Sequence, residues 1–109
     1  MIMHIVTFSW REGTTAAQVT ELADALDALV PLVPQLRSYR HGPDLRLREG
    51  NADYAVAATL ETPQQLPDYL DHPEHLRIVR DILTPMLGSR QAIQIEVPEA
   101  PGLRDVEVA

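Results

Sequence analysis

The chain has 109 residues, 16 acidic and 9 basic side chains, a formal net charge of −7 and no cysteine. This length is typical of one domain, the acidic balance excludes nucleic acid as the expected partner, and the missing cysteines exclude disulfides and thiolate chemistry. No apolar run approaches the roughly 20 residues that cross a bilayer, and the opening residues lack a signal-peptide pattern, so we expect a cytoplasmic protein without a membrane partner.

The first part of the chain predicts a strand, a helix and a second strand. Residues 2–9 alternate two sets of side chains and are rich in β-branched and aromatic types, as in a strand with two usable faces. Residues 15–18, TAAQ, form a capping-box pattern, and apolar side chains then recur at helical intervals. Pro31 and Pro34 predict where this helix loosens and ends. Residues 36–42 can form the second strand.

The second part of the chain predicts a strand, a helix and a last strand. Residues 54–61 are strand-like and follow a connection rich in polar residues, glycine and proline. Thr62 and the following proline predict the start of a helix that continues to Leu87, with Gly88 suited to its end. Residues 92–97 alternate apolar and polar side chains, as expected of a closing strand.

The predicted order β-α-β-β-α-β is a split βαβ unit that carries both helices on one side of an α+β sheet. The other sheet face then needs a cover, and apolar residues on both sides of several strands indicate that a second copy of the chain supplies it. We assign residues 1–97 to one domain and residues 98–109 to a C-terminal tail.

The stretch YLDHPEH spaces Tyr69, His72 and His75 at intervals of three residues. An imidazole titrates near neutral pH, so His75 is a candidate general base, with Tyr69 on the same helix side as its partner. The alternative is that both are hydrogen-bonded core residues between helix and sheet. His72 directly precedes Pro73, which favours a cap at a restarted helix.

His4 alternates with Val6 and Phe8 and shares their face, so it either points into the same cavity as His75 or is a satisfied interior histidine. The motif H-x-x-H offers too few ligands for zinc, and no glycine-rich phosphate loop is present, so no cofactor is expected. Three aromatic residues are expected at a rim or an interface, namely Trp10, Tyr39 and Tyr54.

A structural Mg²⁺ is a separate alternative at the end of the first helix, where prolines interrupt the backbone ladder. Its ligands would be the backbone carbonyls of Val30, Val33 and Leu36.

Three segments together resemble the stress-responsive dimeric alpha/beta barrel (Dabb) family over about residues 2–97. They are the opening M-x-H-I-V-x-F, a helix end V-P-x-L with Tyr and Gly downstream, and D-Y-L-D-H-P-E-H. The resemblance implies a ferredoxin-like βαββαβ protomer that pairs into a homodimer, whose two sheets form a dimeric α+β barrel.

The resemblance also implies residue roles, because one plant member of the family is a cofactor-independent polyketide cyclase that performs an intramolecular aldol condensation. Its catalytic histidine matches His75, its partner tyrosine matches Tyr69, and a pocket histidine matches His4. A further pocket tyrosine of that enzyme corresponds to Leu26 here. Because of this difference, the resemblance does not imply that the two proteins share a substrate.

Two functions are therefore expected. In the first, His75 and Tyr69 catalyse proton abstraction next to a carbonyl, and a small apolar or polyketide-like substrate contacts His4, His72, Leu26 and Phe8. In the second, the chain is a non-catalytic stress-response protein that acts through its stability or through ligand binding. A cofactor-free monooxygenase of the same superfold is a third option. An enzyme requires an open cavity around His75 and Tyr69, whereas a structural protein should fill that space.

Overall fold

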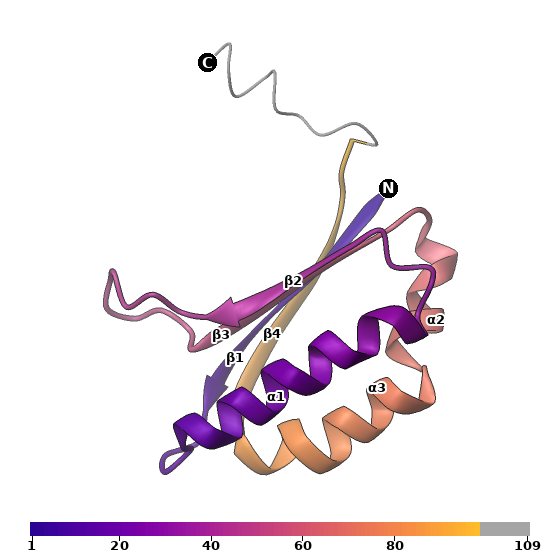
Figure 1. Ribbon diagram of the computed structural model, residues 1–109. Coiled ribbons are helices and arrows are strands. Elements are labelled where there is room, and N and C mark those ends of the chain that lie inside the picture. Colours follow the sequence, from indigo (N-terminus) through magenta and orange to yellow (C-terminus); the bar gives the residue numbers. More distant parts are fainter. Residues whose placement is uncertain (99–109) are drawn as a thin grey trace.

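The computed structural model describes residues 1–98, and a four-stranded antiparallel sheet with helices on one face forms its framework (Figure 1). The sheet order is β2-β3-β1-β4. The strands are β1 (Ile2–Trp10), β2 (Ser38–Pro43), β3 (Tyr54–Leu60) and β4 (Leu87–Glu96). This confirms the predicted α+β, ferredoxin-like order of elements. The predicted tail lies outside the described residues from position 99 onward.

Helix α1 (Ala16–Leu29) begins at the predicted capping box. The Thr15 hydroxyl accepts the Gln18 backbone N–H at 3.2 Å, and the Gln18 side chain accepts the Thr15 backbone N–H at 2.8 Å. The helix ends in a 3₁₀ turn, Val30–Leu32, that contains Pro31, as the proline predicted. Its buried stripe, which packs on the sheet, consists of Leu22, Leu26 and Leu29.

The second helical region is broken at Pro73, which confirms the predicted restart, but its last turn ends at Met86 and not at Leu87 as predicted. Helix α2 (Leu66–Leu70) and helix α3 (Pro73–Ile78) are separated at Asp71 and His72 because Pro73 lacks the N–H that a continuing helix needs. The remaining turns are the 3₁₀ turns Pro63–Gln65 and Thr84–Met86 and the π-helical turn Val79–Leu83.

Gly88 does not end a helix; it lies inside β4, which begins at Leu87 rather than at residue 92 as predicted. A Cβ atom at this position would lie 3.0 Å from the Ser9 carbonyl oxygen and 3.1 Å from the Trp10 carbonyl group. The register of β1 against β4 shifts at Ser9 and Trp10, and this irregularity brings the two backbones close together. Glycine is favoured there because the space for a side chain is tight, and not because the backbone is left-handed.

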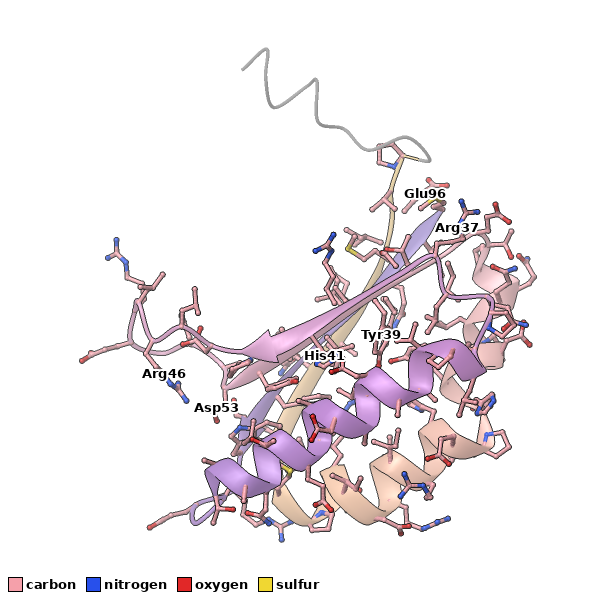
Figure 2. All side chains as sticks on the ribbon, viewed as in Figure 1. Arg37, Tyr39, His41, Arg46, Asp53 and Glu96 are labelled. Atoms are coloured by element: carbon pink, nitrogen blue, oxygen red, sulfur yellow. The ribbon has the colours of Figure 1, made fainter. Side chains whose placement is uncertain are left out.

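The hydrophobic core fills the layer between the helices and the inner sheet face, where alternate residues of β1 and β3 are buried. Figure 2 shows Tyr39 and His41 on the α1 side of β2, whereas Arg46 and Asp53 lie at the end of the β2–β3 hairpin. Tyr54 is buried in the core at 2% exposure, so its predicted rim position is wrong.

The outer sheet face carries apolar residues without a helical cover: Ile93 and Ile95 are 56% and 40% exposed. None of the helices within residues 1–98 is both long and apolar enough to cross a membrane.

Candidate active site

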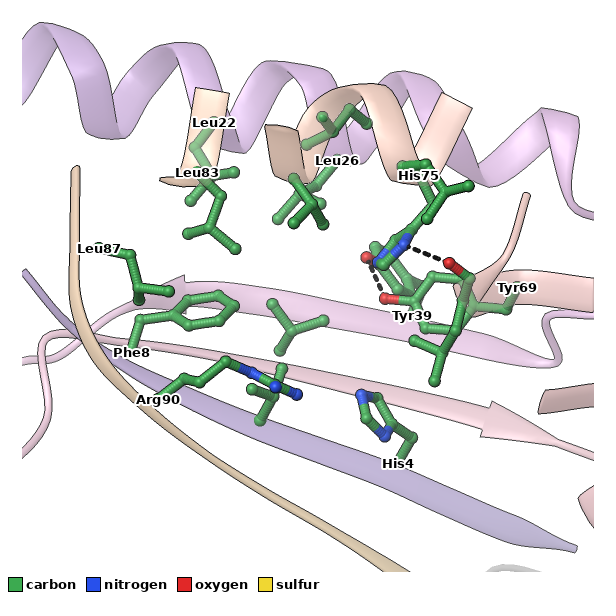
Figure 3. Close-up of a pocket in the computed structure, with 16 residues that line it drawn as sticks. His4, Phe8, Leu22, Leu26, Tyr39, Tyr69, His75, Leu83, Leu87 and Arg90 are labelled. Carbon is green, nitrogen blue, oxygen red and sulfur yellow. Dashed lines mark hydrogen bonds between the residues drawn. The ribbon is translucent and has the colours of Figure 1, made fainter. Parts of the chain in front are cut away.

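A cavity of about 240 Å³ lies between the inner face of the sheet and the helices (Figure 3). Most of its wall is aliphatic or aromatic. The lining side chains that can exchange hydrogen bonds are His4, Tyr39, Tyr69, His75 and Arg90.

The structure brings five of the six predicted site residues to this cavity. Its lining includes His4 and Phe8 of β1, Leu26 of α1, Tyr69 of α2 and His75 of α3.

The sixth, His72, does not line the cavity. Its Nδ1 accepts the Glu74 backbone N–H at 3.0 Å, which makes His72 the N-cap of α3. Its place is therefore the structural one that the following proline suggested.

The break between α2 and α3 also explains how His75 is held. In a continuous helix the Leu70 carbonyl would accept the N–H of Glu74. Here that N–H is taken by the His72 cap, and the Leu70 carbonyl oxygen instead accepts a hydrogen bond from His75 Nδ1 at 2.9 Å. Because a carbonyl oxygen can only accept, the Nδ1 atom carries the proton, and neutral His75 has its lone pair on Nε2.

The Nε2 atom of His75 has no hydrogen-bond partner among residues 1–98, and no side-chain nitrogen or oxygen described there is both fully buried and unpartnered. The Nε2 atom is therefore accessible. Burial lowers the pKa of His75 below its ordinary 6.5, although the bond to the Leu70 carbonyl acts in the opposite direction. His75 is thus a neutral base at pH 7.

His4 presents the opposite polarity. Its Nδ1 accepts a hydrogen bond from the Gln94 side-chain amide at 2.8 Å, so neutral His4 carries its proton on Nε2. His4 is only 3% exposed, and burial, followed by the charges of Arg90 and His75, lowers its pKa below 6.5. The cavity therefore contains one imidazole that can accept a proton and one that can donate a hydrogen bond.

Tyr69 and Tyr39 form a hydroxyl pair, with their oxygens 2.8 Å apart. The Tyr69 ring stands edge-on to His75, with ring centroids 4.7 Å apart, and its hydroxyl bonds Tyr39 and not the imidazole. Burial raises the pKa of Tyr69 to about 12 and also raises the pKa of Tyr39, so both phenols are protonated at neutral pH. Whichever hydroxyl donates within the pair, the other keeps a proton for a ligand.

Sequence reasoning missed three polar groups of this site: Tyr39, Gln94 and Arg90. Tyr39 and His4 both pair with Ala58, and Gln94 pairs with His4. The cross-strand register therefore places Tyr39 and Gln94 beside His4, and this register was not predicted from the sequence. Arg90 was missed because β4 was predicted to start beyond it. Tyr39 is half-buried and lines the cavity, and its expected position at a rim or interface stays a prediction.

At the expected cation position, at the end of α1, two of the carbonyl oxygens already accept a backbone hydrogen bond. The Val30 oxygen accepts the Val33 N–H at 3.2 Å, and the Val33 oxygen accepts the Leu36 N–H at 3.1 Å. Each oxygen retains a second lone pair, so the structural Mg²⁺ stays a prediction. Within residues 1–98, no three His, Asp or Glu side chains gather as a metal site.

The sheet order, the one-sided helical layer and the cavity beneath it define a ferredoxin-like α+β protein. The family model described as "Stress responsive A/B Barrel Domain" (Dabb) matches residues 2–97. The chain belongs to this family.

Three known proteins are similar to this chain. The chain is 25% identical over 103 residues to a stress-response A/B barrel domain-containing protein of Arabidopsis thaliana; it covers 39% of that protein, and 94% of the present chain is aligned. It is 25% identical over 77 residues to olivetolic acid cyclase of Cannabis sativa, with 69% of this chain and 76% of the cyclase covered.

The third is a crystal structure of a dimeric ferredoxin-like protein of unknown function from Thermobifida fusca. It is 38% identical with a TM-score of 0.82, and the alignment covers 88% of this chain and 90% of that one.

Proposed function

We propose that the chain is a cofactor-independent acid–base enzyme that removes a proton from a carbon next to a carbonyl group. The observation that carries this proposal is the opposite polarity of the two histidines in one apolar cavity. His75 offers a lone pair on Nε2, because its Nδ1–H is held by a carbonyl, and His4 offers an N–H on Nε2, because its Nδ1 is held by an amide.

The proposed reaction needs only groups of this chain. His75 Nε2 takes the proton from the carbon, and negative charge develops on the carbonyl oxygen as the enolate forms. The spare O–H of the Tyr39–Tyr69 pair and the Nε2–H of His4 donate hydrogen bonds to that oxygen. If the enolate carbon attacks a second carbonyl of the same molecule, a carbon–carbon bond forms and the His75 proton returns to the new alkoxide. An aldol-type cyclisation of a small apolar or polyketide-like substrate is the nearest model.

We also propose that the enzyme is a homodimer joined through the outer sheet faces. The exposed Ile93 and Ile95 of β4 form an apolar surface with Met3 and Ile5 of β1, and the similar Thermobifida fusca protein is described as dimeric.

The experiment that tests the catalytic proposal is deuterium exchange into 4-phenylbutan-2-one in D₂O, followed by proton NMR. The wild-type chain should exchange the protons next to the ketone, and His75→Gln should lower the rate by about a hundredfold or more. The control is His72→Asn, which removes an imidazole but keeps a good cap residue and should retain the rate. An unchanged rate in His75→Gln would refute the proposal.

A second candidate function is a non-catalytic stress-response protein that binds a small apolar ligand or acts through its stability. The hydroxyl of Tyr69 pairs with Tyr39 rather than with His75, which favours this alternative because the expected polarised pair is not formed. Saturable binding of 4-phenylbutan-2-one without any exchange above buffer would select it.

A further inference from the structure

Arg90 gives the cavity a charge that the proposed proton transfer does not use. Its guanidinium is permanently protonated, whereas His4 and His75 are neutral at pH 7 because their pKa values are lowered. Figure 3 shows the Arg90 side chain extending from β4 along the cavity floor toward His4. None of the residues that line the cavity is acidic. An acidic protein thus presents a cation, without a counter-charge, to the space where a ligand would bind.

The position of Arg90 follows from the sheet register. Arg90 pairs with Phe8, and Gln94 pairs with His4, so both lie on the inner face of β4. The helical layer does not cover this strand, and Arg90 is exposed at the cavity edge, where water solvates its charge in the free protein.

Arg90 differs from the arginines that stabilise the surface. Within residues 1–98 it makes no hydrogen bond or ion pair, while four other arginines bind neighbouring carboxylates. These pairs are Arg37–Glu61, Arg46–Asp53, Arg77–Glu74 and Arg80–Asp81. A guanidinium that faces a cavity without a carboxylate partner keeps its paired N–H donors free to bind an anion.

The chemistry of the site selects a carboxylate as that anion. One arginine matches the two oxygens of a carboxylate, whereas phosphate sites usually add backbone N–H groups at a helix start or a glycine-rich loop, and no glycine lines this cavity. We propose that the ligand is a small oxo acid whose carboxylate binds Arg90 while its ketone lies between His4 and His75. The ketone half of this assignment rests on the proposed function; the carboxylate half does not.

The test compares 4-oxo-4-phenylbutanoate with its methyl ester, by calorimetry for binding and by deuterium exchange for reaction. The wild-type chain should bind the acid about tenfold more tightly than the ester. Arg90→Gln should remove this preference by weakening binding of the acid about tenfold more than binding of the ester, and Arg90→Lys should retain part of it. Arg48→Gln makes the same charge change in the exposed β2–β3 loop and should retain all of it.

Four other outcomes would each overturn the proposal that Arg90 binds a carboxylate. Equal binding of acid and ester by the wild type, or an acid preference that survives in Arg90→Gln, would overturn the proposal. Inorganic phosphate competing more strongly than acetate would assign Arg90 to a phosphoryl group and overturn the carboxylate. A change of oligomeric mass in Arg90→Gln would make it an interface residue and also overturn the proposal. The exchange of neutral 4-phenylbutan-2-one tests the proposed function independently, so the two ideas can fail separately.

Discussion

The hydrogen bond between the Tyr39 and Tyr69 hydroxyls predicts that these two oxygens stabilise the fold as one unit. The oxygens are 2.8 Å apart, and Tyr69 is 2% exposed. Tyr39→Phe and Tyr69→Phe each remove the same bond while leaving the aromatic packing in place. The double variant should therefore be little less stable than either single variant.

The magnitude follows from the surroundings of the pair. A hydrogen bond contributes about 1 kcal/mol net, and a buried hydroxyl left without a partner costs roughly 1–3 kcal/mol. Because the pair borders a cavity that admits water, the lower end applies. Each single variant should lose about 1 kcal/mol, and the double variant about 1 kcal/mol instead of about 2. In a domain of this size such a loss lowers Tm by roughly 4–8 °C.

The assay is urea unfolding followed by the fluorescence of Trp10, the single tryptophan, at one fixed protein concentration because a dimer unfolds in a concentration-dependent way. Tyr54→Phe is the control, since the Tyr54 hydroxyl bonds His41 at 2.7 Å. Its effect should add to that of Tyr69→Phe within about 0.5 kcal/mol. Fully additive losses for Tyr39→Phe and Tyr69→Phe would show that the bond does not couple them.

Further predictions concern pH, packing and assembly. Because neutral His75 is the base and its pKa is lowered, the exchange rate should stay constant down to pH 6.5 and fall only below it; a midpoint above 6.5 contradicts the assignment. The lowered pKa of buried His4 means that the unfolded chain binds more protons, so unfolding free energy in urea should decrease as pH falls below 6.5, and less so in His4→Gln. Gly88→Ala should lose about 1–3 kcal/mol in urea unfolding, whereas Gly42→Ala, which meets open space, should not. Ile93→Glu should give monomers by light scattering if the outer faces join, while the exposed Leu47→Glu should not.

The order of elements was predictable because each element has a local signal. The capping box at residues 15–18 and the proline at position 31 act within a few residues, and the structure places the start and end of α1 where they indicated. The inner-face position of His4 and Phe8 followed from simple alternation along β1.

The parts that escaped prediction depend on partners far away in the chain. Gly88 is the residue type that commonly ends a helix, and only the close approach of the Ser9 and Trp10 backbone shows that it belongs to a strand. The predicted start of β4 lay beyond Arg90, so this residue was not assigned to either face of the sheet. Its pairing with Phe8, which places it on the cavity side, could not be predicted from the sequence. Tyr39 acquires its place through Ala58, which links β2 and β1 across the sheet.

The spacing of the two histidines around Pro73 acquires a physical reason from the structure. The proline stops α2, His72 caps the restarted helix by accepting the Glu74 N–H, and the Leu70 carbonyl is thereby released to accept from His75. Without the break, the Leu70 oxygen would return to the helical ladder, and Nδ1 of His75 would lose the partner that decides which nitrogen carries the proton. The loss of helix continuity and the presentation of a basic Nε2 atom are therefore two consequences of one local sequence, in which Pro73 stands where helix propensity alone would disfavour a proline.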